Sequence, residues 1–301
     1  MERILSYTIT PEENQMKISD FLKTKGFSSQ NIIELKKMNR SILIDNKWMH
    51  VNERLKTNQN LVIHIQETGS NEHIVASNLP FPIIYEDEDL VVINKPADMP
   101  IHPSQNNYNN TLANAAAYYY ETLQNIPFTY RCINRLDRNT TGLTILAKNM
   151  YSANILAHQM QNRSIKRLYV AILDKPLEKK WGTIRLPIGR KEGSTIERVI
   201  DFEKGEKAVT HYYCIKQLGT YCLAAFQLET GRTHQIRVHM AANNTPLVGD
   251  TLYNLHSSST LLDRQALHAY RISFHHPYTK KLMKFTAPIP EDMYQFLQMY
   301  E

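Results

Sequence analysis

A polar stretch from Gln66 to Pro82 divides the 301-residue chain into a short N-terminal part and a long C-terminal part. The stretch is rich in Gly, Ser, Asn and Pro, residues that favour turns and loops over helices and strands. We therefore expect two domains, at residues 1–67 and 83–301, joined by a linker at residues 68–82. Both lengths are compatible with folded domains.

The N-terminal part combines two helical patterns with strand patterns. The apolar residues of 16–24 recur at helical spacing, and a second helix can be capped by Ser28 or Ser29. A hairpin pattern follows at 42–51, and an alternating strand pattern at 61–65. These patterns predict a small α/β domain.

Beyond residue 83 the strand patterns outnumber the helical ones. Helical patterns occur at 112–123, after the capping residue Thr111, and at 152–161. Strand patterns occur at 90–93, 143–147, 167–173, 210–216 and 221–228. A fully parallel sheet would need a crossover, usually a helix, between every pair of strands. The sequence therefore predicts an α+β fold with a mixed, mainly antiparallel sheet and flanking helices.

The composition excludes several classes of protein. Hydrophobic residues at 42% and charged residues at 21% are typical of an ordinary folded protein. No apolar run approaches the roughly 20 residues of a membrane span, and the polar start does not fit a signal peptide. The three cysteines form no CxxC pair, which argues against a disulfide framework. We expect a cytoplasmic protein without membrane association.

The chain carries a net charge of +6, and most of the surplus lies in the C-terminal part. Residues 1–75 hold ten Lys or Arg against nine Asp or Glu, whereas the remainder holds 25 against 20. This surplus is compatible with a polyanionic partner, but it does not identify one.

The first segment with unusual polar content is the loop at 134–142. Asp137 stands between Arg135 and Arg138, and their positive charge favours the ionised carboxylate. Such a carboxylate can act as a nucleophile or an electrostatic stabiliser. A salt bridge that only stabilises the loop is the alternative.

A second segment begins at Arg232, where Thr233 can cap a helix. Unpaired backbone N–H groups at this helix start, together with Arg232, would suit a phosphate or carboxylate. His234 and Arg237 lie on different faces of the helix. His234 and His239 are five residues apart rather than four, so we expect no metal site.

The third segment is the strand pattern that contains Tyr169. Strand alternation places Tyr169 on the face opposite Leu168 and Val170. Taken alone, this tyrosine could simply be packed in the core. The chain has no P-loop, dinucleotide, GxSxG or HExxH motif, so we expect no cofactor.

From about Ile83 to the C-terminus, these segments in this order resemble the RluA/RluD-type pseudouridine synthases. The matching segments include RLDR at 135–138, KRLYVA at 166–171 and GRTHQIRVH at 231–239, with further matches at 88–97, 101–103, 246–250, Tyr253, 267–269 and 276–277. Residues 1–67 resemble the S4-like RNA-binding domain in their helix–helix–hairpin order. The resemblance implies a cofactor-free isomerase that converts uridine in RNA to pseudouridine.

The resemblance also implies roles for three residues in the chemistry. Asp137 would be the catalytic carboxylate, and Arg237 would pair with it and hold it ionised. Tyr169 would stack against the uracil and is a candidate to help remove the proton on carbon 5.

Further residues are expected to bind RNA. The target base must leave the RNA stack, and by resemblance Arg135 would fill the space that it leaves. Lys95, Arg138, Arg232 and His234 are expected to help hold the RNA around the cleft. We expect a monomer acting on large-subunit ribosomal RNA, with transfer RNA as the second candidate.

Three positions depart from the family pattern, and two other functions stay open. Asn134, Asn139 and Thr141 stand where His, Asp and Ser are common. We expect activity to survive these changes. The rival functions are a non-catalytic RNA-binding or ribosome-assembly factor and a glycosidase acting on free nucleosides. A glycosidase commonly uses two carboxylates, and no second carboxylate stands out beside Asp137.

Overall fold

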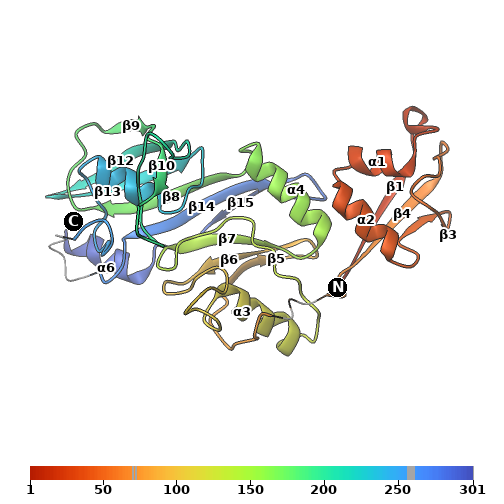
Figure 1. Ribbon diagram of the computed structural model, residues 1–301, viewed down its shortest axis with the longest axis horizontal. Helices are drawn as coiled ribbons and strands as arrows, with labels where there is room; N and C mark the ends of the chain where they lie inside the picture. The colour runs from red at the N-terminus through yellow and green to blue at the C-terminus, as the bar shows by residue number, and fades with distance from the viewer. Residues whose placement is uncertain (70, 72, 256–261, 301) are drawn as a thin grey trace.

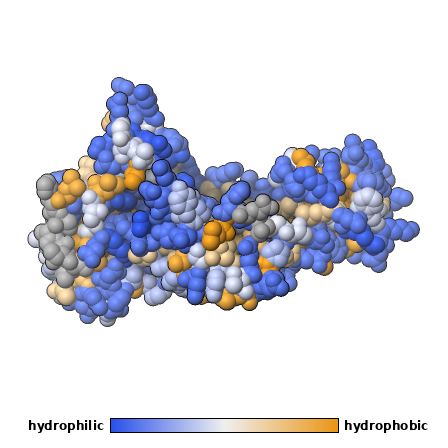
Figure 2. All heavy atoms as spheres, turned by 60° about the horizontal axis from the view of Figure 1, so that its bottom comes forward, coloured by the Kyte–Doolittle hydropathy of each residue, from blue (hydrophilic) through white to orange (hydrophobic). Residues whose placement is uncertain are grey.

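The computed structural model describes residues 1–69, 71, 73–255 and 262–300. It shows an elongated molecule with a small N-terminal unit at one end and a larger body built on a long sheet (Figure 1). The face drawn in Figure 2 is largely hydrophilic, with hydrophobic side chains in small, separate groups. Among the described helices, none combines the length and apolar character that crossing a membrane requires.

The N-terminal unit is a four-stranded antiparallel sheet packed against two helices. In chain order its elements are β1 (Glu2–Thr8), η1 (Pro11–Glu13), α1 (Ile18–Thr24), α2 (Ser29–Lys37), β2 (Ile42–Ile44), β3 (Lys47–Trp48) and β4 (Asn60–Gln66). The strand order is β1-β4-β2-β3. The expected helices are confirmed, and Ser28 caps α2 by accepting a hydrogen bond from the backbone N–H of Asn31.

Strand β1 has no counterpart among the sequence patterns. Leu5 is its only fully buried residue, opposite Ile63 of β4, so its apolar alternation is weak. The strand forms because β4 offers it a complete antiparallel ladder, from Glu2 opposite Gln66 to Thr8 opposite Asn60. This pairing joins residues about 60 positions apart, which no local pattern could reveal.

The body contains a nine-stranded, mainly antiparallel sheet, which confirms the expected α+β fold. Its strands are β5 (Ile83–Glu86), β6 (Leu90–Lys95), β7 (Thr141–Ala147), β8 (Lys166–Leu173), β9 (Trp181–Ile184), β12 (Thr210–Leu218), β13 (Tyr221–Leu228), β14 (Leu267–His275) and β15 (Leu282–Thr286). The order is β5-β6-β7-β14-β8-β13-β12-β9, and β15 pairs with β14. Only β7 and β14 run parallel. A separate hairpin consists of β10 (Ile188–Arg190) and β11 (Arg198–Ile200).

Four helical segments cover the two faces of this sheet. They are α3 (Leu112–Ala117), which continues as the π-helix η2 (Tyr118–Leu123), α4 (Met150–Gln161), α5 (Gln235–Ala242) and α6 (Glu291–Met299). The core with α3 and α5 contains Tyr169 of β8, whereas α6 packs with its neighbour Val170. Strand alternation therefore places Tyr169 on the sheet face that α3 and α5 cover.

The described residues of the expected linker lie against the body. The side-chain oxygen of Asn71 accepts a hydrogen bond from the Tyr130 backbone N–H, at 2.7 Å. Glu67 is almost fully buried, and its carboxylate pairs with Arg131 and accepts from the Met150 backbone N–H. Polar contacts of this kind fasten the start of α4 to the end of β4.

Candidate active site

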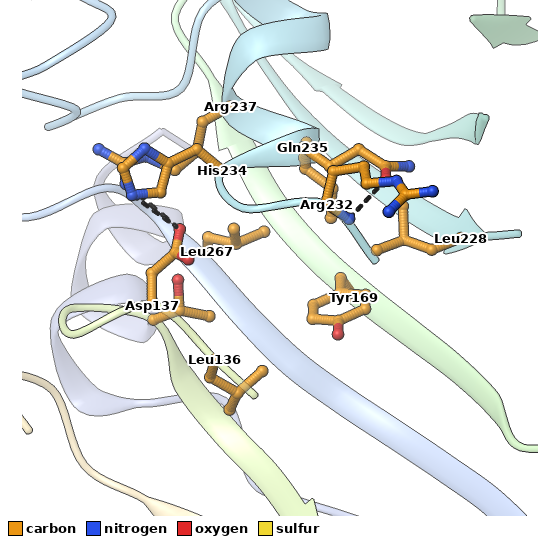
Figure 3. A pocket seen from close by; sticks show the side chains of 11 residues that line it. Leu136, Asp137, Tyr169, Leu228, Arg232, His234, Gln235, Arg237 and Leu267 are labelled. Carbon is orange, nitrogen blue, oxygen red and sulfur yellow. Dashed lines mark hydrogen bonds and ion pairs between the residues drawn. The ribbon is translucent and has the colours of Figure 1, made fainter. Parts of the chain in front are cut away.

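The site lies on the sheet face covered by α3 and α5, where three chain segments meet. Asp137 comes from the loop before β7, Tyr169 from β8, and Arg237 from α5. These three side chains line one pocket together with Leu136 and Leu267 (Figure 3). The three sequence segments singled out for their chemistry thus contribute to one pocket.

Arg237 connects Asp137 to a second carboxylate. Its Nη1 lies 3.2 Å from Oδ2 of Asp137, while Nε and Nη2 donate to the two oxygens of Asp250 at 2.8 and 2.9 Å. Burial opposes the charge on Arg237, but Asp250 and Asp137 raise its pKa above the ordinary value. The two-point contact with Asp250 fixes the guanidinium plane, so that Nη1 points at Asp137.

Asp250 is completely buried, and sequence reasoning assigned it no function. It belongs to a segment that matches the resembled family, but it is 13 residues from Arg237, beyond the reach of a helical pair. Its carboxylate also accepts the backbone N–H groups of Leu252 and Tyr253. The family match at 246–250 was the signal that could have pointed to it.

His234 faces Asp137 from the start of α5. Its Nε2 lies 4.0 Å from Oδ2 of Asp137, and its Nδ1 lies 2.8 Å from the hydroxyl of Tyr253. The expectation that Thr233 caps α5 is wrong, because His234 itself occupies the N-cap position in a left-handed conformation. His239, the other histidine of this segment, is fully buried and contacts Thr210 and the Leu186 carbonyl.

Lys95 does not reach the surface where RNA would lie. It is fully buried, and its ammonium donates to the carbonyls of Pro96, Met99 and Arg138 at 2.7 to 2.9 Å. Burial lowers its pKa to about 7, although Asp137 acts in the opposite direction. The phosphate contact expected of this lysine is therefore incompatible with its position. It supports the loop that carries Asp137 instead.

The expected RNA-binding arginines are accessible. Arg135 and Arg138 are exposed beside a second hollow, which shares Asp137 and His234 with the Tyr169 pocket. Arg138 forms an exposed ion pair with Asp98, and Arg232 pairs with Glu206. Asp137 thus stands between an aromatic pocket and a surface lined by arginines.

The three residues that depart from the family pattern make structural contacts. Asn134 is buried and hydrogen-bonds the backbone of Leu143 and Ile145. The Asn139 side chain accepts from the Asp98 backbone N–H, and the Thr141 hydroxyl contacts Nδ1 of His268. In each case the side chain braces the loop or β7 rather than lining the pocket.

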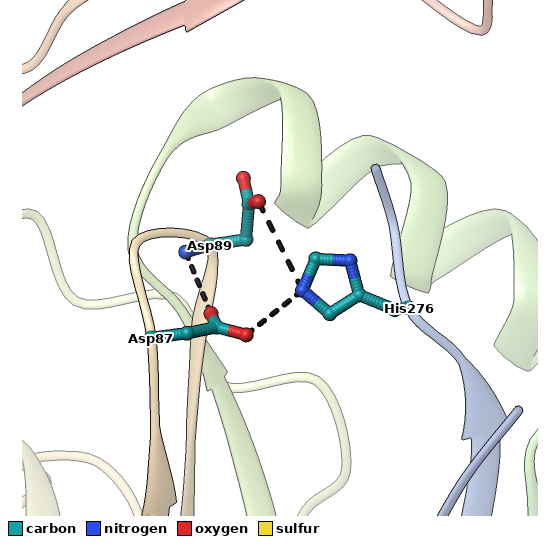
Figure 4. Close-up of side chains that lie close together, drawn as sticks. All are labelled: Asp87, Asp89 and His276. Atoms are coloured by element: carbon teal, nitrogen blue, oxygen red, sulfur yellow. Dashed lines mark hydrogen bonds and ion pairs between the residues drawn. The ribbon is translucent and has the colours of Figure 1, made fainter. Parts of the chain in front are cut away.

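Asp87, Asp89 and His276 form a separate cluster whose oxygen and nitrogen atoms lie close together (Figure 4). Nδ1 of His276 accepts two backbone N–H groups, so Nε2 carries the proton and donates to Asp87 at 2.8 Å. Asp89 is already engaged by the guanidinium of Arg3, which lies 3.0 Å away. These donors and acceptors satisfy one another, so the arrangement fits a structural latch better than a cation site.

Comparison with known proteins shows which family this chain belongs to. The family model described as RNA pseudouridylate synthase matches residues 89–242, just over half of the chain. The uncharacterized RNA pseudouridine synthase YjbO of Bacillus subtilis is 35% identical over 94% of this chain and 99% of its own. Ribosomal large subunit pseudouridine synthase D of Pseudomonas aeruginosa is 34% identical, over 86% of this chain and 83% of its own.

A solved structure shares the fold. Human RNA pseudouridylate synthase domain containing 1 superposes with a TM-score of 0.58 at 22% identity, covering 75% of this chain and 96% of the human one. At that level of identity, the likeness is evidence for the fold alone.

Proposed function

Since this chain belongs to the RNA pseudouridylate synthase family, and is therefore an RNA pseudouridine synthase, we propose that its reaction depends on the carboxylate of Asp137. The observation that carries this proposal is the contact of Asp137 with the buried, charged Arg237 in a pocket shared with Tyr169. An adjacent guanidinium favours the ionised carboxylate. An ionised carboxylate can attack the sugar, or steady the positive charge that develops where the base leaves it.

Tyr169 is proposed to hold the uracil. It is buried at the wall of the pocket, where its ring can stack on a base that has left the RNA helix. Its hydroxyl is the candidate to assist removal of the proton on carbon 5. A phenol with an ordinary pKa of about 10 is a weak base at neutral pH, so stacking is its main proposed role.

RNA is proposed to lie over the cleft formed by the Tyr169 pocket and the second hollow, on the side where Arg135 and Arg138 are exposed. Arg135 would enter the space left by the flipped base, and Arg138 would contact the backbone. Arg190 and Arg198 are opposite one another on the β10–β11 hairpin, and with Arg232 they line a further hollow beside the cleft. This concentration of guanidinium groups suits phosphate.

The substrate proposed first is large-subunit ribosomal RNA, because several relatives are named ribosomal large subunit pseudouridine synthase D. Transfer RNA is the second candidate. We propose residues 1–67 as an S4-like RNA-binding domain, residues 68–82 as the connecting segment and residues 83–301 as the catalytic domain. One chain supplies Asp137, Tyr169 and Arg237, which is compatible with action as a monomer. With ribosomal RNA as substrate, the reaction would take place in the cytoplasm.

Tritium release from RNA labelled at carbon 5 of uridine tests this proposal. Ribosomal and transfer RNA from cells that lack the protein serve as separate substrates. We expect wild type to release tritium, and Asp137→Asn to release none while still binding RNA. Asp98→Asn is the matched control, because it removes an exposed carboxylate from the same region and should retain activity.

Normal release by Asp137→Asn would remove this carboxylate from the mechanism. Tyr169→Phe keeps the ring and removes the hydroxyl. Undiminished turnover in that variant would eliminate the proton-transfer role and leave stacking.

A further inference from the structure

We propose that Tyr253 and His234 form a positioning pair for Asp137, in which Tyr253 fixes His234 as the neutral tautomer that presents Nε2–H to the carboxylate. This inference rests on the proposed function, because it assumes that Asp137 is the reacting carboxylate. It gives His234 a place beside the reacting group, whereas the sequence indicated only RNA contact. It also gives Tyr253 a function.

The hydrogen bonds around Tyr253 support the proposed tautomer. The Tyr253 oxygen accepts a hydrogen bond from the Arg198 backbone N–H at 2.8 Å. Its own hydrogen is then free to be donated to Nδ1 of His234, also at 2.8 Å. With Nδ1 as the acceptor of that hydrogen, a neutral imidazole carries its own proton on Nε2.

Nε2 of His234 lies near the oxygen that Arg237 also contacts. Nε2 lies 4.0 Å from Oδ2 of Asp137, and Nη1 of Arg237 lies 3.2 Å from the same atom. Catalytic hydrogen bonds are often long in a free enzyme and shorten when substrate binds. Within the described part of the chain, Oδ1 of Asp137 accepts no hydrogen bond. Two donors on Oδ2 would leave Oδ1 as the oxygen that approaches the sugar.

The backbone of His234 supports a functional role. Its φ of 58° lies in the left-handed region, which is unfavourable for a residue other than glycine. Such outliers persist where the surroundings hold them in place, often at functional sites. Here the side chain is held by Tyr253 and lines both hollows of the cleft.

The surroundings also favour neutral His234. Burial lowers the pKa of His234 below the ordinary value of about 6.5, and the positive charges of Arg237 and Arg198 act in the same direction. The carboxylates of Asp137 and Asp250 oppose them. His234 is therefore neutral at pH 7 and gains its proton only below its ordinary pKa. The positive charge that His234 then gains beside Asp137 would make the carboxylate a weaker nucleophile. Activity should therefore fall as the pH falls through the lowered pKa of His234.

The test compares pH profiles of kcat/KM for tritium release by wild type, His234→Gln and Tyr253→Phe. We expect His234→Gln to lower kcat about 10- to 100-fold, the scale of a misplaced reacting group, with little change in KM for RNA. It should also lose the acidic limb that His234 produces in wild type. Tyr253→Phe removes the donor to Nδ1, so its acidic limb should move to higher pH.

His211→Gln is the control, because His211 contacts Thr183 and Glu229 away from the pocket and should leave the wild-type profile unchanged. Thermal unfolding verifies that each variant is folded, and Tyr253→Phe alone decides the matter if His234→Gln does not fold. A wild-type acidic limb in His234→Gln, or an unshifted limb in Tyr253→Phe, would overturn the inference. Asp137→Asn run in parallel keeps the two proposals apart: turnover by that variant contradicts the proposed function itself.

Discussion

The ammonium group of Lys95 shows how one side chain can support a site without touching substrate. It donates to the carbonyls of Met99 and Arg138, and so ties the end of β6 to the loop of Asp137. A carbonyl that is withdrawn from water without a donor is costly, and here one lysine donates to three carbonyls. The loop conformation therefore depends on a residue that is itself inaccessible.

Lys95→Met keeps the approximate size of the side chain and removes every donor. We expect the free energy of unfolding to fall by about 2–4 kcal/mol, because the Pro96 and Met99 carbonyls lose the ammonium that donates to them and the Arg138 carbonyl keeps only the Met99 backbone N–H. Urea denaturation measures this change. Lys175→Met, at an exposed lysine, should stay within about 0.5 kcal/mol of wild type. Equal stability of the two variants would show that the Lys95 contacts contribute little.

Among the secondary-structure elements, the junction of β7 and β14 limits which substitutions the chain tolerates. These are the only parallel neighbours in the large sheet, paired at Thr141–His268 and Gly142–Ala269. Gly142 has a φ of +109°, and a Cβ there would lie 2.4 Å from the Ala269 carbonyl oxygen. The close approach lets β14 fit beside the start of β7, directly after the Asp137 loop.

Gly142→Ala should therefore destabilise the protein by more than the backbone strain alone. We expect a loss of at least about 2 kcal/mol in the free energy of unfolding, from the positive φ and the backbone clash together. Gly219→Ala provides the comparison, since Gly219 also has positive φ but open space around its Cβ position. That variant should lose about 1 kcal/mol. If urea denaturation gave the same loss of unfolding free energy for both variants, the backbone clash at position 142 would make no contribution to stability.

At the scale of the whole molecule, contacts with α4 and the Asp87–Asp89–His276 latch hold the N-terminal unit against the body. Arg3 of β1 reaches Asp89, and its guanidinium also lies 4.4 Å from the ring centre of Tyr278. The Tyr151 hydroxyl on α4 donates to the Lys25 carbonyl. These contacts join the N-terminal unit to the body.

Arg3→Met would leave the nearly inaccessible carboxylate of Asp89 without its cation. We expect a loss of about 2 kcal/mol in the free energy of unfolding, because a buried carboxylate loses its ion pair. The loss is no larger because Ser152 and Asn149 still donate to Asp89. The exposed pair of Arg163 and Glu229 is the control, and Arg163→Met should cost less than about 1 kcal/mol. A smaller loss of unfolding free energy for Arg3→Met than for Arg163→Met would contradict the stabilising role of the contact between Arg3 and Asp89.

The latch also predicts a pH dependence. Burial opposes ionisation of Asp87, but hydrogen bonds from His276, Tyr85 and the Asp89 backbone hold its pKa well below the usual range. A carboxyl with a lowered pKa in the folded state stabilises fully above its unfolded pKa of about 3.9, and less as the pH falls towards the folded value. The stability difference between wild type and Asp87→Asn should therefore shrink below about pH 4. A difference that grows on acidification would contradict this sign.

Local patterns in the sequence were enough to predict the α+β class and most strands of the sheet, whereas the resemblance to a known family implied that Asp137, Tyr169 and Arg237 act together. Strand alternation and short motifs report which side chains face the core or the pocket, because these features repeat within a few residues. They could not predict β1, the inward direction of Lys95, the two-point hold of Asp250 on Arg237, or the contact of Arg3 with Asp89. Each of these depends on a partner far along the chain, and burial and partner together decide what a charged side chain does. Only the tertiary structure brings those partners within hydrogen-bonding distance.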